Sequence, residues 1–411
     1  MSTESNSRPT SHFNRSQLAQ QYGEALLRTS PGSASGSGLF LAAPRRTGKS
    51  TFVREDLRPE LISRGAVVLY ADLWADKGRD PGDVLVNAVR TELAVHDGLV
   101  ARLAKSAGMD KVSVGGMGFS LDRVGLGADV SISAALSSLS DQLKRPIVFI
   151  IDEAQHAITT DKGMDALFAL KAARDELNST AHYGLRIVAT GSNRDKLAML
   201  RNSKDQAFFG ALLINFPHLD DKYVRWFCDG VGLVSPLLEH EVCKLFERAS
   251  FRPEILGAAA DALRFDFNIA AADVNSQFAA AVNLEIQADR DRTLRVVRGL
   301  TSLQSCVLRV MASHGERYAP FEPLTVAAYR RVLDAIDPGY KAKLEAPNIQ
   351  QALIALQERT LVWKEKRGIY ALEESSTADL LAAEGMLEAV PGLLDMHDIS
   401  DTPSSADRAG R

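Results

Sequence analysis

Five short apolar runs alternate with segments of helical periodicity through the first half of the chain. The runs have the length of β-strands and lie at residues 39–42, 66–70, 147–151, 185–190 and 212–216. In the segments between them, apolar residues recur every three to four positions, as they do in helices that cover a sheet. The alternation predicts an α/β fold with a parallel sheet between helices. An amphipathic helix is expected before them, at residues 16–27.

The longest gap between two runs separates the second from the third. A helix is expected at residues 84–104. In residues 112–132 apolar positions alternate with polar residues and glycines around a turn at residues 121–123. Such a pattern predicts a two-stranded hairpin inserted into the α/β part.

The strand signal ends at Pro217, and helical segments follow. They are expected at residues 222–228, 236–248, 253–263 and 275–297, and they predict a small helical domain. Residues 299–373 contain further helical periodicity and close with two β-like runs, at residues 360–363 and 368–372. Helices followed by a small hairpin are the outline of a winged helix-turn-helix.

The composition indicates a chain with a sizeable core. Of 411 residues, 45% are hydrophobic and 24% are charged, which excludes a fibrous or wholly disordered chain. With 48 Lys and Arg against 52 Asp and Glu, the formal net charge is −4, so attraction to nucleic acid requires a local basic patch. The three cysteines have no paired spacing, and no apolar stretch approaches the roughly 20 residues of a membrane span. Because residues 1–13 also lack the apolar segment of a signal peptide, we expect a cytoplasmic location without membrane contact.

A phosphate-binding loop follows the first apolar run. Residues 43–50 read Ala-Pro-Arg-Arg-Thr-Gly-Lys-Ser and fit G-x-x-x-x-G-K-[ST], except that Ala43 replaces the first glycine. In such a loop, backbone N–H groups face the phosphates, and the Ser50 hydroxyl is a Mg²⁺ ligand. Lys49 is expected to supply positive charge to the β- and γ-phosphates, with its charge in a surface cleft and not in the core. We therefore expect nucleotide to be bound by Ala43, Pro44, Arg45, Arg46, Thr47, Gly48, Lys49, Ser50 and Thr51.

Two carboxylates end the third apolar run. Asp152 and Glu153 follow residues 147–151, and parallel strands bring their carboxyl ends to the edge where ligands bind. Asp152 is expected to hold Mg²⁺, directly or through water, and Glu153 to polarise the attacking water. By itself such a pair is also typical of a helix N-cap, and the phosphate loop is what favours the catalytic interpretation.

Further candidates for the site follow the fourth run and open a helix of the helical domain. Ser192 or Asn193 could reach the γ-phosphate or the water, although turn chemistry also explains both. Arg194 or Arg201 could serve a neighbouring subunit as an arginine finger, and surface arginines are the alternative. Arg252 precedes Pro253 at the start of a helix and is either a nucleotide ligand or a surface residue.

Together, these motifs resemble the P-loop ATPases of the AAA+ and STAND kinds, and most closely the archaeal-type ATPase family. In that family the phosphate loop commonly reads Gly-Pro-Arg-Arg-x-Gly-Lys, the acidic strand ends in Asp-Glu-x-Gln, and the chain ends in a winged helix. The run at residues 152–155, Asp-Glu-Ala-Gln, is also similar to the ATPase subunits of Tn7-like transposition. The resemblance covers about residues 39–372. It implies ATP and Mg²⁺ as ligands, Ser192 as the first sensor and Arg252 as the second, with Ala43 and Phe251 as departures from the pattern.

The expected domains follow from these signals. They are an N-terminal lead-in and helix (1–36), a P-loop ATPase core with the inserted hairpin (37–218), a helical lid (219–298), a winged helix (299–374), and a short helix with a disordered acidic tail (375–411).

We expect an ATPase of the molecular-switch kind that forms homo-oligomers with ATP and assembles on DNA. The expected DNA contacts of the winged helix are Gln350, Gln351, Lys364, Lys366 and Arg367, because lysine and arginine neutralise phosphates and glutamines read base edges. The alternative is a signalling or defence regulator whose winged helix binds protein or clamps the ATPase, since acidic residues dilute the basic charge of the module.

Overall fold

The structure is a computed structural model. It describes residues 12–28, 34–96, 131–179, 181–192, 194–201, 206–341, 343–364, 370–374 and 376–390. The chain divides into two compact units, Met1–Asn283 and Leu284–Arg411. Residues 112–130 of the expected hairpin lie outside the described residues, and Ile132 begins a helix.

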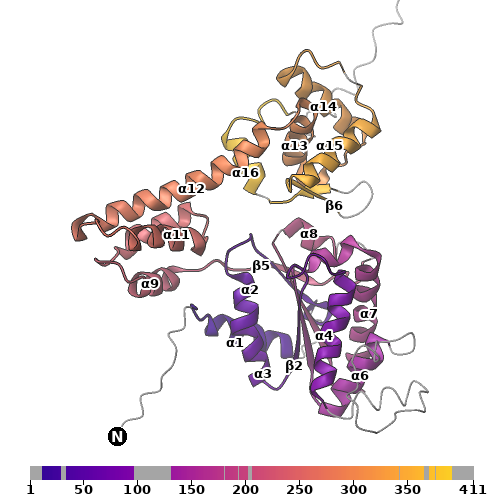
Figure 1. Ribbon diagram of the computed structural model, residues 1–411. Coiled ribbons are helices and arrows are strands. Elements are labelled where there is room, and N and C mark those ends of the chain that lie inside the picture. Colours follow the sequence, from indigo (N-terminus) through magenta and orange to yellow (C-terminus); the bar gives the residue numbers. More distant parts are fainter. Residues whose placement is uncertain are drawn as a thin grey trace, which may run out of the picture. The chain divides into compact units, whose positions relative to one another are not determined.

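A five-stranded sheet is the centre of the first unit (Figure 1). Its strands are β1 (Leu39–Ala42), β2 (Val67–Asp72), β3 (Ile147–Asp152), β4 (Leu185–Gly191) and β5 (Leu212–Asn215). They lie in the order β2-β3-β4-β1-β5, and every pairing is parallel. The predicted α/β fold with a parallel sheet is therefore confirmed.

Helices cover both faces of the sheet (Figure 1). On one side lie α1 (Ser16–Leu27) and a continuous helix made of α2 (Lys49–Thr51), the π-helical stretch η2 (Phe52–Leu57) and α3 (Arg58–Ser63). On the other lie α4 (Pro81–Val95), α6 (Ile132–Leu143) and α7 (Asp161–Leu177). Because both faces are covered, all six residues of β3 are buried and its sequence is an unbroken apolar run up to Asp152.

Polar residues begin the helices on that second side. Asp80 accepts a hydrogen bond from the backbone N–H of Gly82 at 2.8 Å, and Pro81 occupies the first turn of α4. Thr160 caps α7 in the same way through Gly163 N, at 3.0 Å. Short helical turns complete this part of the unit: η1 (Ala34–Ser37), η3 (Ala154–Thr159) and α8 (Arg194–Ala198).

Helices follow β5, as the sequence predicts. They are α9 (Asp221–Gly230), α10 (Glu239–Arg248), α11 (Pro253–Arg264), the turn η4 (Ala271–Asp273) and α12 (Val274–Arg298). Aromatic rings join them: the centroid of Tyr223 lies 5.2 Å from that of Phe246, and Phe227 lies 6.2 Å from Phe278. The division between the two compact units falls within α12.

The second unit has three main helices and a small antiparallel sheet. Its elements are α13 (Ser302–His314), η5 (Gly315–Arg317), α14 (Pro323–Ile336), α15 (Ala346–Glu358), β6 (Val362–Lys364), β7 (Tyr370–Leu372) and α16 (Ser376–Ala383). The fully buried Val307, Tyr329 and Leu353 bring the three helices to one core. This is the order of elements expected of a winged helix-turn-helix. Across the described ranges, no helix combines the length and apolarity needed to cross a membrane.

Candidate functional site

The phosphate loop connects β1 to α2. It is tied to β4 by the hydrogen bond from Ala43 N to Gly191 O, at 3.1 Å, and the Thr47 hydroxyl donates to Pro44 O at 2.8 Å within the loop. Gly48 has a φ of 82°, in the left-handed region that favours glycine, and a Cβ at this position would meet only Leu219 Cδ1, at 3.8 Å. The backbone turn therefore explains the glycine, and the space beside it remains open.

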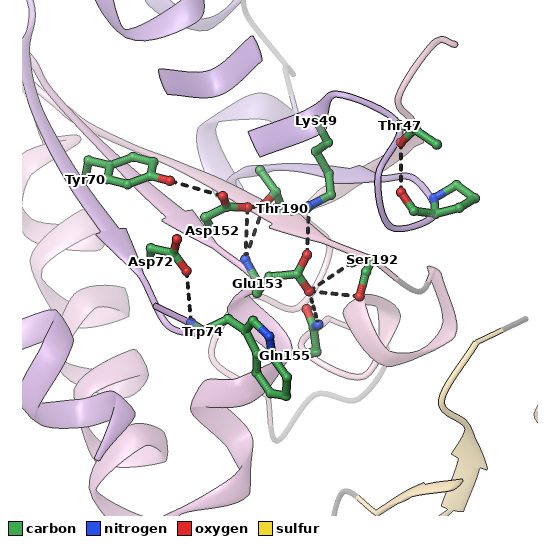
Figure 2. A network of polar contacts seen from close by, with 11 residues as sticks. Thr47, Lys49, Tyr70, Asp72, Trp74, Asp152, Glu153, Gln155, Thr190 and Ser192 are labelled. Atoms are coloured by element: carbon green, nitrogen blue, oxygen red, sulfur yellow. Dashed lines mark hydrogen bonds and ion pairs between the residues drawn. The ribbon is translucent and has the colours of Figure 1, made fainter. Parts of the chain in front are cut away.

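Lys49 points from the start of α2 to the carboxyl ends of β3 and β4 (Figure 2). Its Nζ lies 2.9 Å from Glu153 Oε1 and 3.4 Å from Asp152 Oδ1. The side chain is only 4% exposed, so the expectation that Lys49 places its charge in a surface cleft is wrong. The two carboxylates account for the difference, because a buried ammonium requires charged partners.

Asp152 is held from both sides by hydroxyl groups of neighbouring strands (Figure 2). Tyr70 of β2 donates to Oδ2 at 3.1 Å, and Thr190 of β4 donates to Oδ1. Burial and the nearby Asp152 carboxylate raise the pKa of Tyr70, so its hydroxyl keeps its proton. Neither Tyr70 nor Thr190 is predicted as a site residue from the sequence, although each is a polar side chain near the end of an otherwise apolar strand.

Glu153 lies directly after β3 in the left-handed conformation, with a φ of 53°. Its Oε2 accepts hydrogen bonds from Gln155 Nε2 at 2.6 Å, Ser192 Oγ at 2.9 Å and Ser192 N at 3.3 Å. Burial alone would raise the pKa of Glu153, but attraction to Lys49 and the hydrogen bonds from Lys49, Gln155 and Ser192 lower it to about 2. Glu153 is therefore ionised at neutral pH, as a proton acceptor must be.

The candidates that follow β4 differ in whether they contact the acidic pair. Ser192 contacts Glu153, whereas Asn193 lies outside the described residues. Arg194 begins α8, is exposed, and donates through Nη1 to Asn215 Oδ1 at 2.7 Å. Arg201 follows the same helix and is partly buried. Among the described residues, neither arginine forms a hydrogen bond or an ion pair with Lys49, Asp152 or Glu153.

Arg252 and the phosphate loop approach the same carboxylate. Arg252 is the N-cap residue of α11, and its Nε lies 3.8 Å from Glu254 Oε1. Arg46 of the loop, with a φ of 63°, places its Nη1 4.0 Å from the same oxygen. The start of α11 therefore lies beside the loop, although the intervening charge of Glu254 could not be foreseen from the arginine pattern.

Trp74 is surrounded by cationic side chains and contacts the loop through Arg45. Trp74 follows β2 and stacks on His156, with ring centroids 4.2 Å apart. The Arg45 guanidinium lies 5.3 Å from the centre of the Trp74 ring, and the Lys77 ammonium lies 4.2 Å from it. Arg45 thus contacts an aromatic ring after β2, a position that the loop motif does not reveal.

The side chains expected to contact DNA differ in whether they are exposed or already bonded within the second unit. Gln350 donates to Tyr370 Oη at 2.9 Å and accepts from it at 3.1 Å, so its amide is engaged within the domain. Gln351 is exposed, and the Lys364 ammonium lies 5.9 Å from the centre of the Tyr370 ring. Lys366 and Arg367 lie outside the described residues.

The residues present fit a nucleotide with Mg²⁺. Ser50 lies in the first turn of α2, and the Asp152 carboxylate lies at the carboxyl end of β3. The hydroxyl and the carboxylate are the kinds of oxygen ligand that Mg²⁺ prefers. Thr51 is exposed one residue farther into the helix. In the described parts of the chain, no group of three or more His, Cys, Asp or Glu could hold a metal ion.

Comparison with known proteins defines the fold. No protein-family model matches the chain, and no curated protein matches it. Among solved structures, the Walker-type ATPase PABY2304 of Pyrococcus abyssi is 16% identical, with a TM-score of 0.51 over 93% of this chain and 99% of that one. The ADP form of the Aeropyrum pernix ORC2 protein is 14% identical, with a TM-score of 0.51 over 94% and 97%. These likenesses confirm the fold of a P-loop ATPase that the motifs predict.

Proposed function

We propose that the protein binds and hydrolyses ATP. The observation that carries this proposal is the meeting of Lys49 with Asp152 and Glu153 at the carboxyl ends of parallel strands, directly after a phosphate loop. The loop supplies backbone donors, the lysine supplies the cation, and the two acids supply the metal ligand and the base. The fold likeness to a Walker-type ATPase and to an ADP-bound protein supports it.

Each residue of the site has a role in this reaction. With nucleotide bound, Lys49 would exchange the Glu153 carboxylate for the β- and γ-phosphates, and Ser50 and Asp152 would hold Mg²⁺. Bound Mg²⁺ neutralises negative charge on the phosphates. Tyr70 and Thr190 fix the orientation of Asp152.

Hydrolysis requires a proton acceptor beside the water, and Glu153 is that acceptor. The water gives a proton to the Glu153 carboxylate while its oxygen forms a bond to the γ-phosphorus. The bond from that phosphorus to the bridging oxygen breaks, and ADP and inorganic phosphate leave. Ser192, which donates two hydrogen bonds to Glu153, acts with the carboxylate; Asn193 stays a candidate for the γ-phosphate itself.

Arg252 is proposed as the nucleotide ligand of the lid. In the structure Arg252 and Arg46 both lie near Glu254, so a bound triphosphate would compete with Glu254 for two guanidinium groups. Glu254→Gln should therefore strengthen ATP binding, whereas Arg252→Ala should weaken it. Unchanged affinity in both variants, measured by fluorescent-nucleotide titration, would contradict this role.

Two substitutions test the site directly. Lys49→Ala removes the cation and should abolish or severely weaken ATP binding. Glu153→Gln keeps Asp152 for the metal and should retain binding while hydrolysis falls by roughly 10²- to 10⁴-fold. Normal affinity in the first variant would refute the site, and a normal rate in the second would place the base elsewhere.

We also propose that ATP promotes homo-oligomers in which Arg194 or Arg201 reaches a neighbour's γ-phosphate. A complementation assay tests this directly. If Arg201 is the arginine that acts, Arg201→Ala and Glu153→Gln subunits should each have little activity alone, but a mixture contains sites that combine an intact Glu153 with an intact arginine of the neighbour. Recovery of activity on mixing supports action in trans, and Arg194→Ala is tested alongside. A monomer of unchanged mass with an ATP analogue refutes it.

DNA is the partner that we propose for the second unit. Lys364 ends β6, and Lys366 and Arg367 follow it in the sequence before β7, in the segment that we propose as the wing. Exposed Gln351 is the better candidate for a base contact because Tyr370 engages Gln350. Reversing the three charges should weaken duplex binding across sequences and lower the slope of log affinity against log salt by up to about 3. Reversal of exposed Lys144, Lys244 and Arg248 in the first unit is the matched control. Equal losses in both triple variants would contradict a wing contact.

A protein partner for the winged helix is the second candidate. Ile354 of α15 is 45% exposed and shares a helix face with exposed Gln351 and Glu358, a mixture better suited to protein than to phosphates. Turnover stimulated by duplex DNA would favour the first candidate. Turnover indifferent to DNA, with slowly exchanged ADP, would favour a signalling or defence regulator.

A further inference from the structure

Gln155 is wholly buried beside the proposed base. It lies in η3, two residues after Glu153, with 0% exposure. Its Nε2 donates to Glu153 Oε2 at 2.6 Å, and its Oε1 is buried with no hydrogen-bond partner among the described residues. Burial of an amide whose carbonyl oxygen has no hydrogen-bond donor costs folding free energy. Packing alone therefore does not explain a glutamine at this position.

The end of β4 leaves room for this amide. A Cβ on Gly191 would lie 2.8 Å from Gln155 Oε1 and 3.2 Å from Leu197 Cβ. The same glycine carries the carbonyl that accepts from Ala43 N of the phosphate loop. A larger residue at position 191 would therefore press on the glutamine and on Leu197, while its backbone carbonyl could still accept from the loop.

The carboxylate of Glu153 is divided between two sets of donors. Lys49 contacts Oε1, whereas Gln155 and Ser192 donate to Oε2. When Lys49 turns to phosphate, Oε1 loses its partner while Oε2 keeps three hydrogen bonds. One oxygen is then released for water, and the other remains fixed.

We infer that Gln155 is a positioning residue for hydrolysis, which holds Glu153 by Oε2 so that Oε1 faces the attacking water. This inference rests on the proposed ATPase function. Gln155 itself touches neither water nor nucleotide in this scheme; it acts through Glu153. Ser192 has a different position: its N–H and hydroxyl donate to Glu153 Oε2 from the end of β4. Without Gln155, these two hydrogen bonds would hold the carboxylate from one side only.

The test uses Gln155→Met in the full chain, because methionine has nearly the same shape and lacks the donor. We expect kcat to fall by about 10- to 100-fold, less than the loss of the base itself, while affinity for an ATP analogue stays within about twofold. The melting temperature should be unchanged or higher, since the unmatched carbonyl is removed. Gln277→Met on the exposed surface of α12 is the control for the substitution itself.

A double-mutant cycle distinguishes a positioning role of Gln155 from a purely structural one. In a Glu153→Gln background, Gln155→Met should cause no further loss of the residual hydrolysis, because it acts only through the carboxylate. Gly191→Ala should reproduce the fall in kcat by pushing on the amide. A wild-type kcat in Gln155→Met, or an equal loss in both backgrounds, overturns the inference while the proposed function stands. A wild-type chain without any ATPase activity overturns both.

Discussion

Replacement of Lys49 by methionine tests whether the buried charges of the site stabilise the fold as well as bind nucleotide. Methionine keeps most of the apolar stem and removes the ammonium, which leaves Asp152 and Glu153 without their cation. The pKa of Glu153 lies at about 2 against an ordinary value of 4.5. At about 1.4 kcal/mol for each pH unit, this difference of about 2.5 units corresponds to about 3.5 kcal/mol of stability that depends chiefly on Lys49.

The pH dependence gives the sign of the effect. Because the fold lowers the pKa of Glu153, the associated stability is fully present above pH 4.5 and is lost as pH falls toward 2. In Lys49→Met, burial dominates and the pKa of Glu153 rises, so the variant takes up a proton at higher pH than the wild type. The deficit in unfolding free energy should therefore be at least about 3.5 kcal/mol at pH 7 and clearly smaller at pH 4, where the variant's carboxyl is protonated.

Urea unfolding of both proteins at pH 7 and pH 4, without nucleotide, measures this deficit. Hydrogen exchange in β3 and β4 gives a local reading that does not depend on the second unit. A Lys49→Met, Glu153→Gln double variant is the control, because removal of the carboxylate should restore most of the loss. A single variant as stable as the wild type at pH 7, or a deficit that does not change with pH, would refute the reasoning.

Three further substitutions have distinct expected outcomes. Tyr70→Phe removes one hydrogen bond to Asp152 and should raise the Mg²⁺ concentration needed for half-maximal ATPase activity several-fold without altering the circular dichroism spectrum. Gly163→Ala drives a Cβ into the carbonyl oxygen of Ala157, so the melting temperature of the first unit should fall by several degrees. Leu353→Ala empties a fully buried position of the second unit and should cost about 2–5 kcal/mol there, with nucleotide affinity unchanged.

The sequence predicts what depends on neighbours along the chain. The apolar runs place β1 without error and end β3 one residue short of Asp152, because a strand covered on both faces is apolar throughout. The loop and the acidic pair follow these runs directly, so parallel pairing brings them together. The domain boundaries, including the separation of lid from winged helix, stay predictions.

Contacts across strands are what the sequence does not reveal. Tyr70 meets Asp152 because β2 and β3 pair with Asp72 opposite Asp152, a register that no local pattern specifies. Gln155 reaches back to Glu153 only because the chain turns through a left-handed residue. The loop motif predicts the function of Lys49. The burial of this side chain depends on Asp152, Glu153 and Thr190, which lie where β3 and β4 end.

The fluorescence of Trp74 can report on changes in the phosphate loop, because this ring stacks on His156 and lies near Arg45. Indole emission is sensitive to adjacent charge, and the Trp74 ring lies against His156 and near the guanidinium of Arg45, a residue of the loop itself. The chain has only two other tryptophans, Trp226 and Trp363, so Trp226→Phe and Trp363→Phe together leave a single emitter. Stopped-flow fluorescence of that protein follows the loop in real time, without a label, as ligand arrives and departs.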